Sequence, residues 1–284
     1  MADHGASGRV PRSVGWSAVE ARHCVIRPDT SRCIVSLATD RKAFPSGLIR
    51  LRKTLDQIGF GGECRFWSPG NFPPGCPAHL EVPFAFKPFC LAEARSHGRK
   101  TLLWLDSSCL VIRSLKLIFE AIETNGYLLF KNGSNVVGEW ASDAALCEFG
   151  LSRERALAVP EIRAAAIGLD LRCAIGVEFL DAWHEAARKE VPFRGIAEKL
   201  EDWHDYGDVK WNRSGGVSSD SRVRGHRHDQ TVASILADRL GMELTPAGLE
   251  VYSERRPIRP TTAIVIERSM RVELPALTGS PART

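Results

Sequence analysis

The chain has 284 residues, of which 44% are hydrophobic and 25% are charged, and its formal net charge is +4. This is ordinary globular composition with enough apolar side chains for a sizeable core, so the length allows one large α/β domain or two small ones. No run of about 18 apolar residues occurs, so we expect no membrane span, and the mild positive charge does not by itself call for nucleic acid.

The cysteines and the first residues bear on location. None of the eight cysteines forms a Cys-x-x-Cys pair, which argues against a zinc ribbon or a thioredoxin-type site. The opening MADHGASGRVPRS lacks the apolar segment of a signal peptide. We therefore expect reduced thiols and a cytoplasmic protein. Residues 1–32 show no clear period and are expected to form a flexible lead-in.

The first half of the chain alternates expected strands and helices. Leu48, Leu51 and Leu55 recur at helical spacing, whereas the strand candidates are short apolar runs. The strands are Cys33–Leu37, Cys64–Trp67, Leu102–Leu105 and Tyr127–Phe130, and the helices are Gly47–Ile58, Phe89–His97 and Leu115–Thr124. This order predicts a single Rossmann-type domain, with a mixed, mainly parallel sheet flanked by helices.

The second half is less regular. Its expected helices are Ser152–Ala158, Pro160–Ile167, Glu178–Glu190 and Thr231–Leu240, and its expected strands are Cys173–Glu178 and Ala263–Ile266. Residues 201–225 carry many Gly, Ser and charged residues without an apolar period, which indicates a mobile loop. We place the domain at residues 33–250 and a tail at residues 251–284.

Three polar clusters are candidates for chemistry. Asp106-Ser107-Ser108 directly follows the apolar run Leu102–Leu105. A carboxylate at the end of a buried strand lies where α/β sheets bind ligands, although Asp-Ser-Ser is also an ordinary turn sequence. The other two clusters are Glu139 with Asp143, and the segment His226–Gln230.

The chain resembles the core of a GT-A glycosyltransferase over roughly residues 33–244. The resemblance is carried by Lys87-Pro88-Phe89, Leu103–Asp106 and Ile112–Leu115, followed by His228-Asp229-Gln230 at the start of an apolar helix. That family places an Asp-x-Asp motif after an apolar strand, and its retaining members have a later Asp-Gln pair. The order and spacing of the pieces carry the likeness more than any one motif does.

The resemblance implies transfer of a sugar from a nucleotide-diphospho-sugar to an acceptor hydroxyl, and the Asp-Gln likeness favours retention. It implies that Asp106, with Ser107 and Ser108, contacts the donor ribose or a divalent cation, Mn²⁺ or Mg²⁺. The sequence departs from the family because Ser108 stands where the second acid belongs. Either His226 or His228 completes the metal site, or basic side chains neutralise the diphosphate instead.

Four further residues are expected at the donor site. Thr39, Asp40 and Arg41 follow the first strand and, by the resemblance, line the nucleoside pocket, although a plain polar turn explains them equally well. Lys87 contacts a phosphate, or it is a surface lysine with only its stem covered.

Candidate catalytic residues come from the two later clusters. Asp229 and Gln230 match the family's Asp-Gln pair, which faces the donor sugar, whereas Asp229 alone also suits a helix N-cap. Glu139 and Asp143 bind the sugar or act as a base, or they belong to a solvated acidic loop. Trp140 stacks on an acceptor ring or is a buried anchor.

Other functions compete with this interpretation. A metal-dependent hydrolase would use His226, His228 and Asp229 as its metal site. A non-catalytic nucleotide-sugar-binding protein would have lost the second acid of the motif. A nucleic-acid binder using residues 222–227 lacks interleaved aromatics, and a nucleotidyltransferase would need a Gly-rich loop after the first strand. We therefore expect a nucleotide-sugar donor and no nucleic-acid partner.

Overall fold

The structure is a computed structural model that describes residues 31–40, 43–196, 211–212, 215–245, 252–254 and 258–267. Arg41 therefore lies outside the described residues, as do residues 201–210 and 213–214 of the predicted loop at residues 201–225. None of the helices in the described ranges has the length and apolar composition needed to cross a membrane.

A five-stranded sheet with the order β2-β1-β3-β6-β5 forms the centre of the molecule. Its strands are β1 (Arg32–Leu37), β2 (Glu63–Trp67), β3 (Thr101–Leu105), β5 (Tyr127–Val136) and β6 (Pro160–Asp170). β1 pairs in parallel with β2 and β3, whereas β6 pairs antiparallel with β3 and β5. All strands except β6 thus share one direction, and the predicted mixed, mainly parallel sheet is confirmed.

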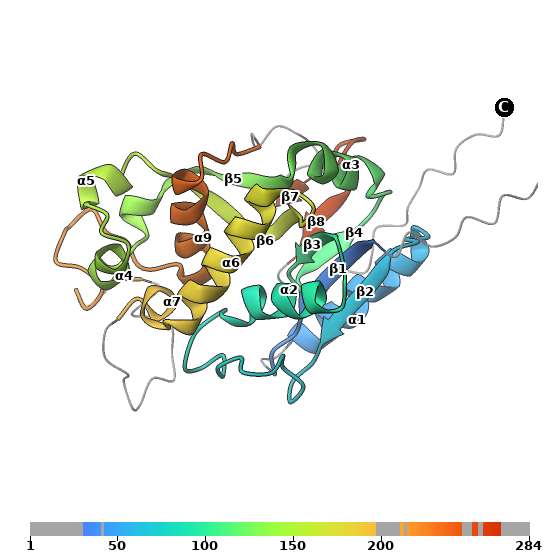
Figure 1. Ribbon diagram of the computed structural model, residues 1–284, viewed down its shortest axis with the longest axis horizontal. Coiled ribbons are helices and arrows are strands. Elements are labelled where there is room, and N and C mark those ends of the chain that lie inside the picture. The colour runs from blue at the N-terminus through green and yellow to red at the C-terminus, as the bar shows by residue number, and fades with distance from the viewer. Residues whose placement is uncertain are drawn as a thin grey trace, which may run out of the picture.

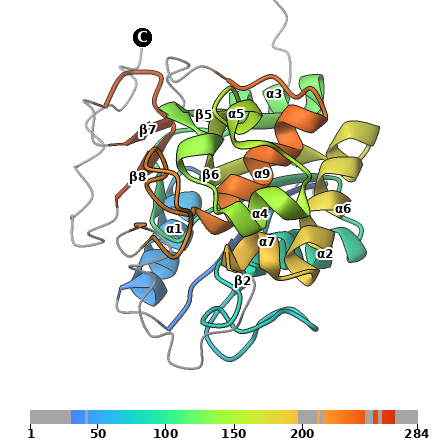
Figure 2. The ribbon, with the colours of Figure 1, turned by 90° about the vertical axis from the view of Figure 1, so that its left-hand side faces the viewer.

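Helices cover both faces of this sheet, as Figure 2 shows for α1 on one side and α2 and α6 on the other. The long helices are α1 (Phe44–Gln57), α2 (Phe86–Ser96), α3 (Lys116–Asn125), α6 (Ala174–Arg188) and α9 (His228–Arg239). Alternating side chains of β1 separate the two core clusters, since Val35 packs toward α2 and Ile34 toward α1 and α3. The five-stranded sheet thus organises one domain.

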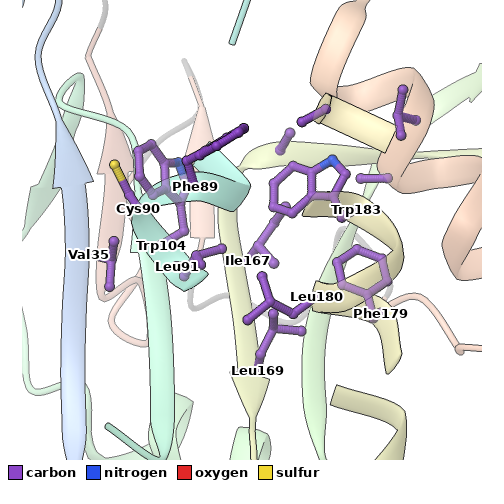
Figure 3. Close-up of a cluster of buried hydrophobic side chains, with 14 of the residues drawn as sticks. Val35, Phe89, Cys90, Leu91, Trp104, Ile167, Leu169, Phe179, Leu180 and Trp183 are labelled. Atoms are coloured by element: carbon purple, nitrogen blue, oxygen red, sulfur yellow. The ribbon is translucent and has the colours of Figure 1, made fainter. Parts of the chain in front are cut away.

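The larger core cluster lies between the sheet and α2, α6 and α9. Figure 3 shows Phe89, Trp104 and Trp183 among its packed side chains. Trp104 and Trp183 are fully buried, and each aromatic ring of this size removes a large apolar surface from water. Figure 1 shows α6 and α9 lying over β6, so this cluster fixes the start of α9 relative to the sheet.

Two element predictions are wrong. Residues 160–167, predicted as a helix, begin β6. Of residues 173–178, predicted as a strand, Cys173 is the N-cap of α6 and the others form its first turns. The run Ala164–Ala166 favours a helix by intrinsic propensity, but its place between β3 and β5 gives it ladder partners on both sides, and this tertiary pairing overrides the propensity. In α6, Phe179, Leu180 and Trp183 are buried at helical spacing.

A second, three-stranded sheet with the order β4-β8-β7 lies beside the first. It consists of β4 (Cys109–Val111), β7 (Tyr252–Glu254) and β8 (Ile264–Ile266). β8 pairs antiparallel with β4, which directly follows the Asp106 turn. The predicted tail at residues 251–284 therefore contributes two strands to the fold, and the expected last strand at Ala263–Ile266 is confirmed.

Short helices complete the described chain. They are η1 (Val137–Glu139), α4 (Asp143–Glu148), α5 (Arg153–Ala156) and α7 (Val191–Arg194). Ser152 is the N-cap of α5 and accepts a hydrogen bond from the Arg155 N–H. Part of the predicted mobile loop packs here: the Asn212 side chain donates to the Ser218 carbonyl at 2.7 Å, and Asp143 N–H donates to the Val217 carbonyl at 3.1 Å.

Candidate active site

The strand order contains a topological switch point between β1 and β3. From β1 the chain continues to β2 on one side of it and then crosses to β3 on the other side. Ligands of open α/β sheets bind outside the carboxyl ends of the strands at such a point. Thr39 follows β1 there and Asp106 follows β3, and the Val35–Trp104 register places these two strand ends side by side.

The centre of the site is the ammonium group of Lys87. Its Nζ lies 2.9 Å from Asp106 Oδ1 and 2.7 Å from Asp229 Oδ2, and it donates a hydrogen bond to the Ala164 carbonyl at 2.9 Å. Three acceptors, at the end of β3, on α9 and on β6, thus lie within 3 Å of the ammonium. Lys87 is only 3% exposed, so the interpretation of a surface lysine is wrong.

The charges of this cluster, here called the Lys87 cluster (Lys87, Asp106 and Asp229), are coupled. Burial by itself would lower the pKa of Lys87, but Asp106 and Asp229 together raise that pKa above its usual value. Burial raises the pKa of Asp229 to about 6, and Lys87 partly offsets that rise. Near neutral pH the cluster therefore holds one cation between two carboxylates and carries a net negative charge.

Asp106 is the more accessible of the two carboxylates. Its side chain is 31% exposed, whereas that of Asp229 is 7% exposed. The Trp104 indole N–H donates to Asp106 Oδ1 at 2.8 Å and fixes the carboxylate at the rim of the sheet. A ligand approaching the strand ends would thus contact Asp106 first, because Asp229 is almost fully buried.

Aromatic rings surround the Lys87 ammonium. Its Nζ lies 5.5 Å from the ring centroid of Phe84 and 5.7 Å from that of Trp104, both within the range of cation–π attraction. Phe84 has φ 62°, a left-handed conformation that is strained for an aromatic residue, and its N–H donates to His79 Nδ1 at 3.1 Å. Strained backbone of this kind is concentrated at ligand sites.

The start of α9 differs from the expected N-cap arrangement. The helix begins at His228 after Arg227, which makes no side-chain cap, and Asp229 lies in the first turn. Its carboxylate turns to Lys87 and not to the helix end. The N-cap interpretation of Asp229 is therefore wrong, and the tertiary contact determines its orientation.

The residues predicted as metal ligands do not fit a metal site. His226 is fully buried, and its Nδ1 accepts from the Ser142 N–H at 3.3 Å while its Nε2 donates to the Pro192 carbonyl at 3.0 Å. Burial, with the neighbouring His228, holds the pKa of His226 well below its usual range.

Two other predicted ligands also have partners within the protein. His228 Nδ1 lies 2.7 Å from the Phe193 carbonyl, and Asp106 is held by Lys87 and Trp104. Ser108 offers only a hydroxyl. Across the described part of the chain, no three His, Cys, Asp or Glu side chains are grouped to hold a metal ion. A divalent cation bound by Asp106, Ser108, His226 and His228 is thus not supported by their positions.

The remaining predicted donor residues lie along the same edge. Thr39 is buried and Asp40 is exposed, while Arg41 lies outside the described residues. Ser107 and Ser108 are both buried in a turn that closes with the Cys109 N–H donating to the Asp106 carbonyl at 2.8 Å. The turn interpretation of this motif is therefore correct, and it coexists with the engagement of Asp106 by Lys87.

Glu139 and Asp143 are each paired with an arginine. Glu139 Oε2 lies 3.5 Å from Arg224 Nη1, and Asp143 Oδ1 lies 2.5 Å from Arg153 Nη2. Trp140 between them is only 2% exposed, so it is a buried anchor and stacking of its ring on an acceptor is excluded in this conformation.

A second buried polar cluster, which the sequence did not predict, lies nearby. Glu161 of β6 is fully buried, accepts a hydrogen bond from Asn132 Nδ2 at 3.0 Å and forms a short ion pair with Arg227. It precedes Ala164 of the Lys87 site by three residues. Glu161 was missed because residues 160–167 were predicted to form a helix. A strand over the same residues places Glu161 and Arg163 on one face.

No protein-family model matches the chain, and a search of curated proteins found no match. Solved structures are similar in fold. A glycosyltransferase involved in glycosylation of the major capsid of PBCV-1 shares 11% identity, with 83% of this chain and 92% of that chain covered and a TM-score of 0.42. For the galactosyltransferase LgtC the identity is 13%, the coverage 83% and 86%, and the TM-score 0.39.

Mouse xyloside xylosyltransferase 1 is 9% identical, with 85% of this chain and 99% of that chain covered and a TM-score of 0.43. These matches concern the fold alone, and at such TM-scores none of them bears on the chemistry of the site. The architecture expected from the sequence, a mixed and mainly parallel sheet in one helix-flanked domain, is confirmed.

Proposed function

We propose that this protein is a glycosyltransferase that moves a sugar from a nucleotide-diphospho-sugar to an acceptor hydroxyl. The observation that supports the proposal is the buried Lys87 ammonium, which lies between Asp106 and Asp229 where β3 ends at the switch point of the sheet. The cluster fixes two carboxylates and one cation at the rim of an α/β sheet. Such a preorganised set of charges can stabilise the charge that develops during group transfer.

In this proposal the strand ends bind the donor. Thr39 and Asp40 after β1 contact the nucleoside, and the partly exposed Asp106 accepts hydrogen bonds from the ribose hydroxyls. Breaking the glycosidic bond places negative charge on the leaving diphosphate and positive charge on the sugar ring. Lys87 fixes the two carboxylates in place, and because the cluster as a whole is negative, its field stabilises the positive charge that develops on the sugar ring.

Asp229 and Gln230 contact the sugar of the donor in this proposal. The Asp229 carboxylate opposes the positive charge that develops at the anomeric carbon, and Gln230 orients the ring through its amide. Glu139 and Asp143 receive no role in bond breaking, because both are committed to ion pairs with arginines. The likeness of Asp229-Gln230 to the retaining families favours retention at the anomeric carbon.

A divalent cation has no step in this mechanism, because the residues expected to bind it do not fit. We expect nucleotide diphosphates or their sugars to stabilise the protein equally with EDTA and with Mn²⁺. At a hundredfold excess over Kd, the gain is about 2.7 kcal/mol, which raises Tm by roughly 5–10 °C. A thermal-shift series with UDP-, GDP-, ADP- and dTDP-sugars measures this.

Two outcomes would contradict these statements separately. Stabilisation that appears only with Mn²⁺ or Mg²⁺ would overturn metal independence and leave the donor class intact. Stabilisation by none of the nucleotides would overturn the proposed function. Release of free sugar or transfer to an added acceptor separates an enzyme from a non-catalytic nucleotide-sugar-binding protein.

The hydrolase alternative has lost its main support. It required His226, His228 and Asp229 to share a metal, whereas Asp229 pairs with Lys87 and both nitrogens of His226 are engaged. Metal analysis of the purified protein tests this point, and a stoichiometric, tightly bound transition metal would restore the hydrolase.

The pH dependence of turnover should follow Asp229. Because its pKa is raised to about 6, we expect turnover to fall as the pH drops through 6, where the carboxylate becomes neutral. The free energy of unfolding should have the opposite pH dependence. Because the pKa of Asp229 in the folded protein lies above the usual 3.8, its stabilising contribution is fully present below pH 3.8 and decreases as the pH rises toward 6. Opposite slopes of turnover and Tm between pH 4 and 6 would support the assignment.

A further inference from the structure

Glu161 has contacts that are unusual for a core residue of a central strand. It is fully buried on β6, and its Oε2 accepts from Asn132 Nδ2 at 3.0 Å and pairs with Arg227 Nη1. Burial raises the pKa of Glu161, while Arg227, Asn132 and Gln230 act to lower it. The carboxylate thus joins β5, β6 and the start of α9.

Arg227 is held from a second side by Trp140. The guanidinium carbon lies 3.5 Å from the Trp140 ring centroid, and the Arg227 N–H donates to the Trp140 carbonyl at 3.2 Å. Trp140 is itself fixed, since its indole N–H donates to Asn135 Oδ1 at 3.3 Å. Arg227 directly precedes α9, and Asp229 and Gln230 lie in the first turn of that helix.

A stabilising role does not explain this pair well. The desolvation of two charges offsets most of their attraction, and apolar residues of similar size often serve stability equally well. What the pair does supply is a fixed distance between β6 and the α9 start. The same strand provides the Ala164 carbonyl to Lys87, so β6 sets the geometry of both polar clusters.

We propose that Glu161 is a positioning residue that holds the Asp229-Gln230 turn in its reactive orientation through Arg227 and the Gln230 amide. Gln230 Nε2 and Glu161 Oε1 are both buried, and among the described residues neither atom has a hydrogen-bond partner within normal hydrogen-bond geometry. Small movements of the turn would bring these two groups together. The inference rests on the proposed glycosyl transfer, because the turn carries the residues assigned to the sugar.

The test uses Glu161→Leu, Arg227→Leu and the double variant. Each single variant leaves one buried charge without its partner, so we expect Tm to fall in both. The double variant removes both charges, and Tm should recover toward the wild-type value. Turnover in the double variant should stay about 10- to 100-fold below wild type, since a displacement of about 1 Å at the reacting groups has an effect of this size.

Further readouts separate positioning from folding. Donor Kd should change little in the double variant, while kcat carries the loss, and Glu161→Gln should restore part of kcat because its amide oxygen still accepts from Asn132 and Arg227. A matched control is the Arg32→Gln/Glu123→Gln pair, which removes an ion pair of 2.6 Å at the start of β1, away from the site, and should leave kcat unchanged.

A double variant with both Tm and kcat at the wild-type level would overturn the positioning role and leave the glycosyltransferase proposal standing. A double variant whose Tm stays as low as in the single variants would also overturn it, since the pair would then be structural. If the wild-type protein turns over no nucleotide sugar, the proposed function fails first and this inference fails with it.

Discussion

Lys87→Met is expected to abolish sugar transfer and to destabilise the protein. Removing the ammonium leaves the carboxylates of Asp106 and Asp229 close together, one of them buried, without a counter-charge. Breaking a buried ion pair in this way typically costs about 3–5 kcal/mol, which lowers Tm by roughly 10 °C in a chain of this size. Circular dichroism melts together with a sugar-release assay measure both effects.

The loss of stability in Lys87→Met should depend on pH. Without Lys87, the pKa of Asp229 rises above its present value of about 6, so the carboxyl is neutral at low pH and the destabilisation grows as pH increases. Adding Asp229→Asn to Lys87→Met removes one buried charge and should recover most of Tm but no activity. A Lys87→Met protein with wild-type Tm and turnover would refute the described arrangement of the site.

Asp229→Asn and Asp106→Ala are each expected to reduce turnover by at least about 100-fold, the usual effect of deleting one preorganised electrostatic group. They should differ in stability. The neutral form of Asp229 is favoured by burial, so the asparagine variant should keep a near-wild-type Tm at pH 7. Asp106→Ala removes an acceptor of both Lys87 and Trp104 and should lower Tm modestly.

Donor binding distinguishes the two aspartates. If Asp106 contacts the ribose, Asp106→Ala should weaken nucleotide-diphosphate binding measured by calorimetry, whereas Asp229→Asn should leave it nearly unchanged because Asp229 faces the sugar. The exposed Ile49→Ala on α1 is a matched surface control that should change neither property. Full turnover in either aspartate variant would contradict the proposed function.

The sequence determined the architecture of the first half of the chain. The strands at β1, β2, β3 and β5 and the helices between them are visible because apolar runs of two different periods alternate there. Asp106 could also be placed, since a polar residue that ends an apolar strand must lie at the rim of the sheet. The start of α9 at His228-Asp229-Gln230 was close to the expected boundary.

The environment of the site residues could not be deduced in this way. From the sequence, Lys87 resembles a surface lysine because charged side chains are usually exposed. Only the packing of α9 and β6 brings Asp229 and the Ala164 carbonyl to its ammonium. His226 and His228 suggested a metal, yet the packing of α4 and α7 engages both ring nitrogens of His226 and Nδ1 of His228.

The same limit applies to β6. Its alanine run favours a helix locally, and the run becomes a strand because β3 and β5 offer backbone partners on both sides. Local periodicity in the sequence therefore determined the elements of the first half of the chain and where Asp106 lies. Only the tertiary structure decided which charges meet, because contacts such as Lys87–Asp229 and Glu161–Arg227 join residues that are far apart in the chain and depend on the packing of whole elements.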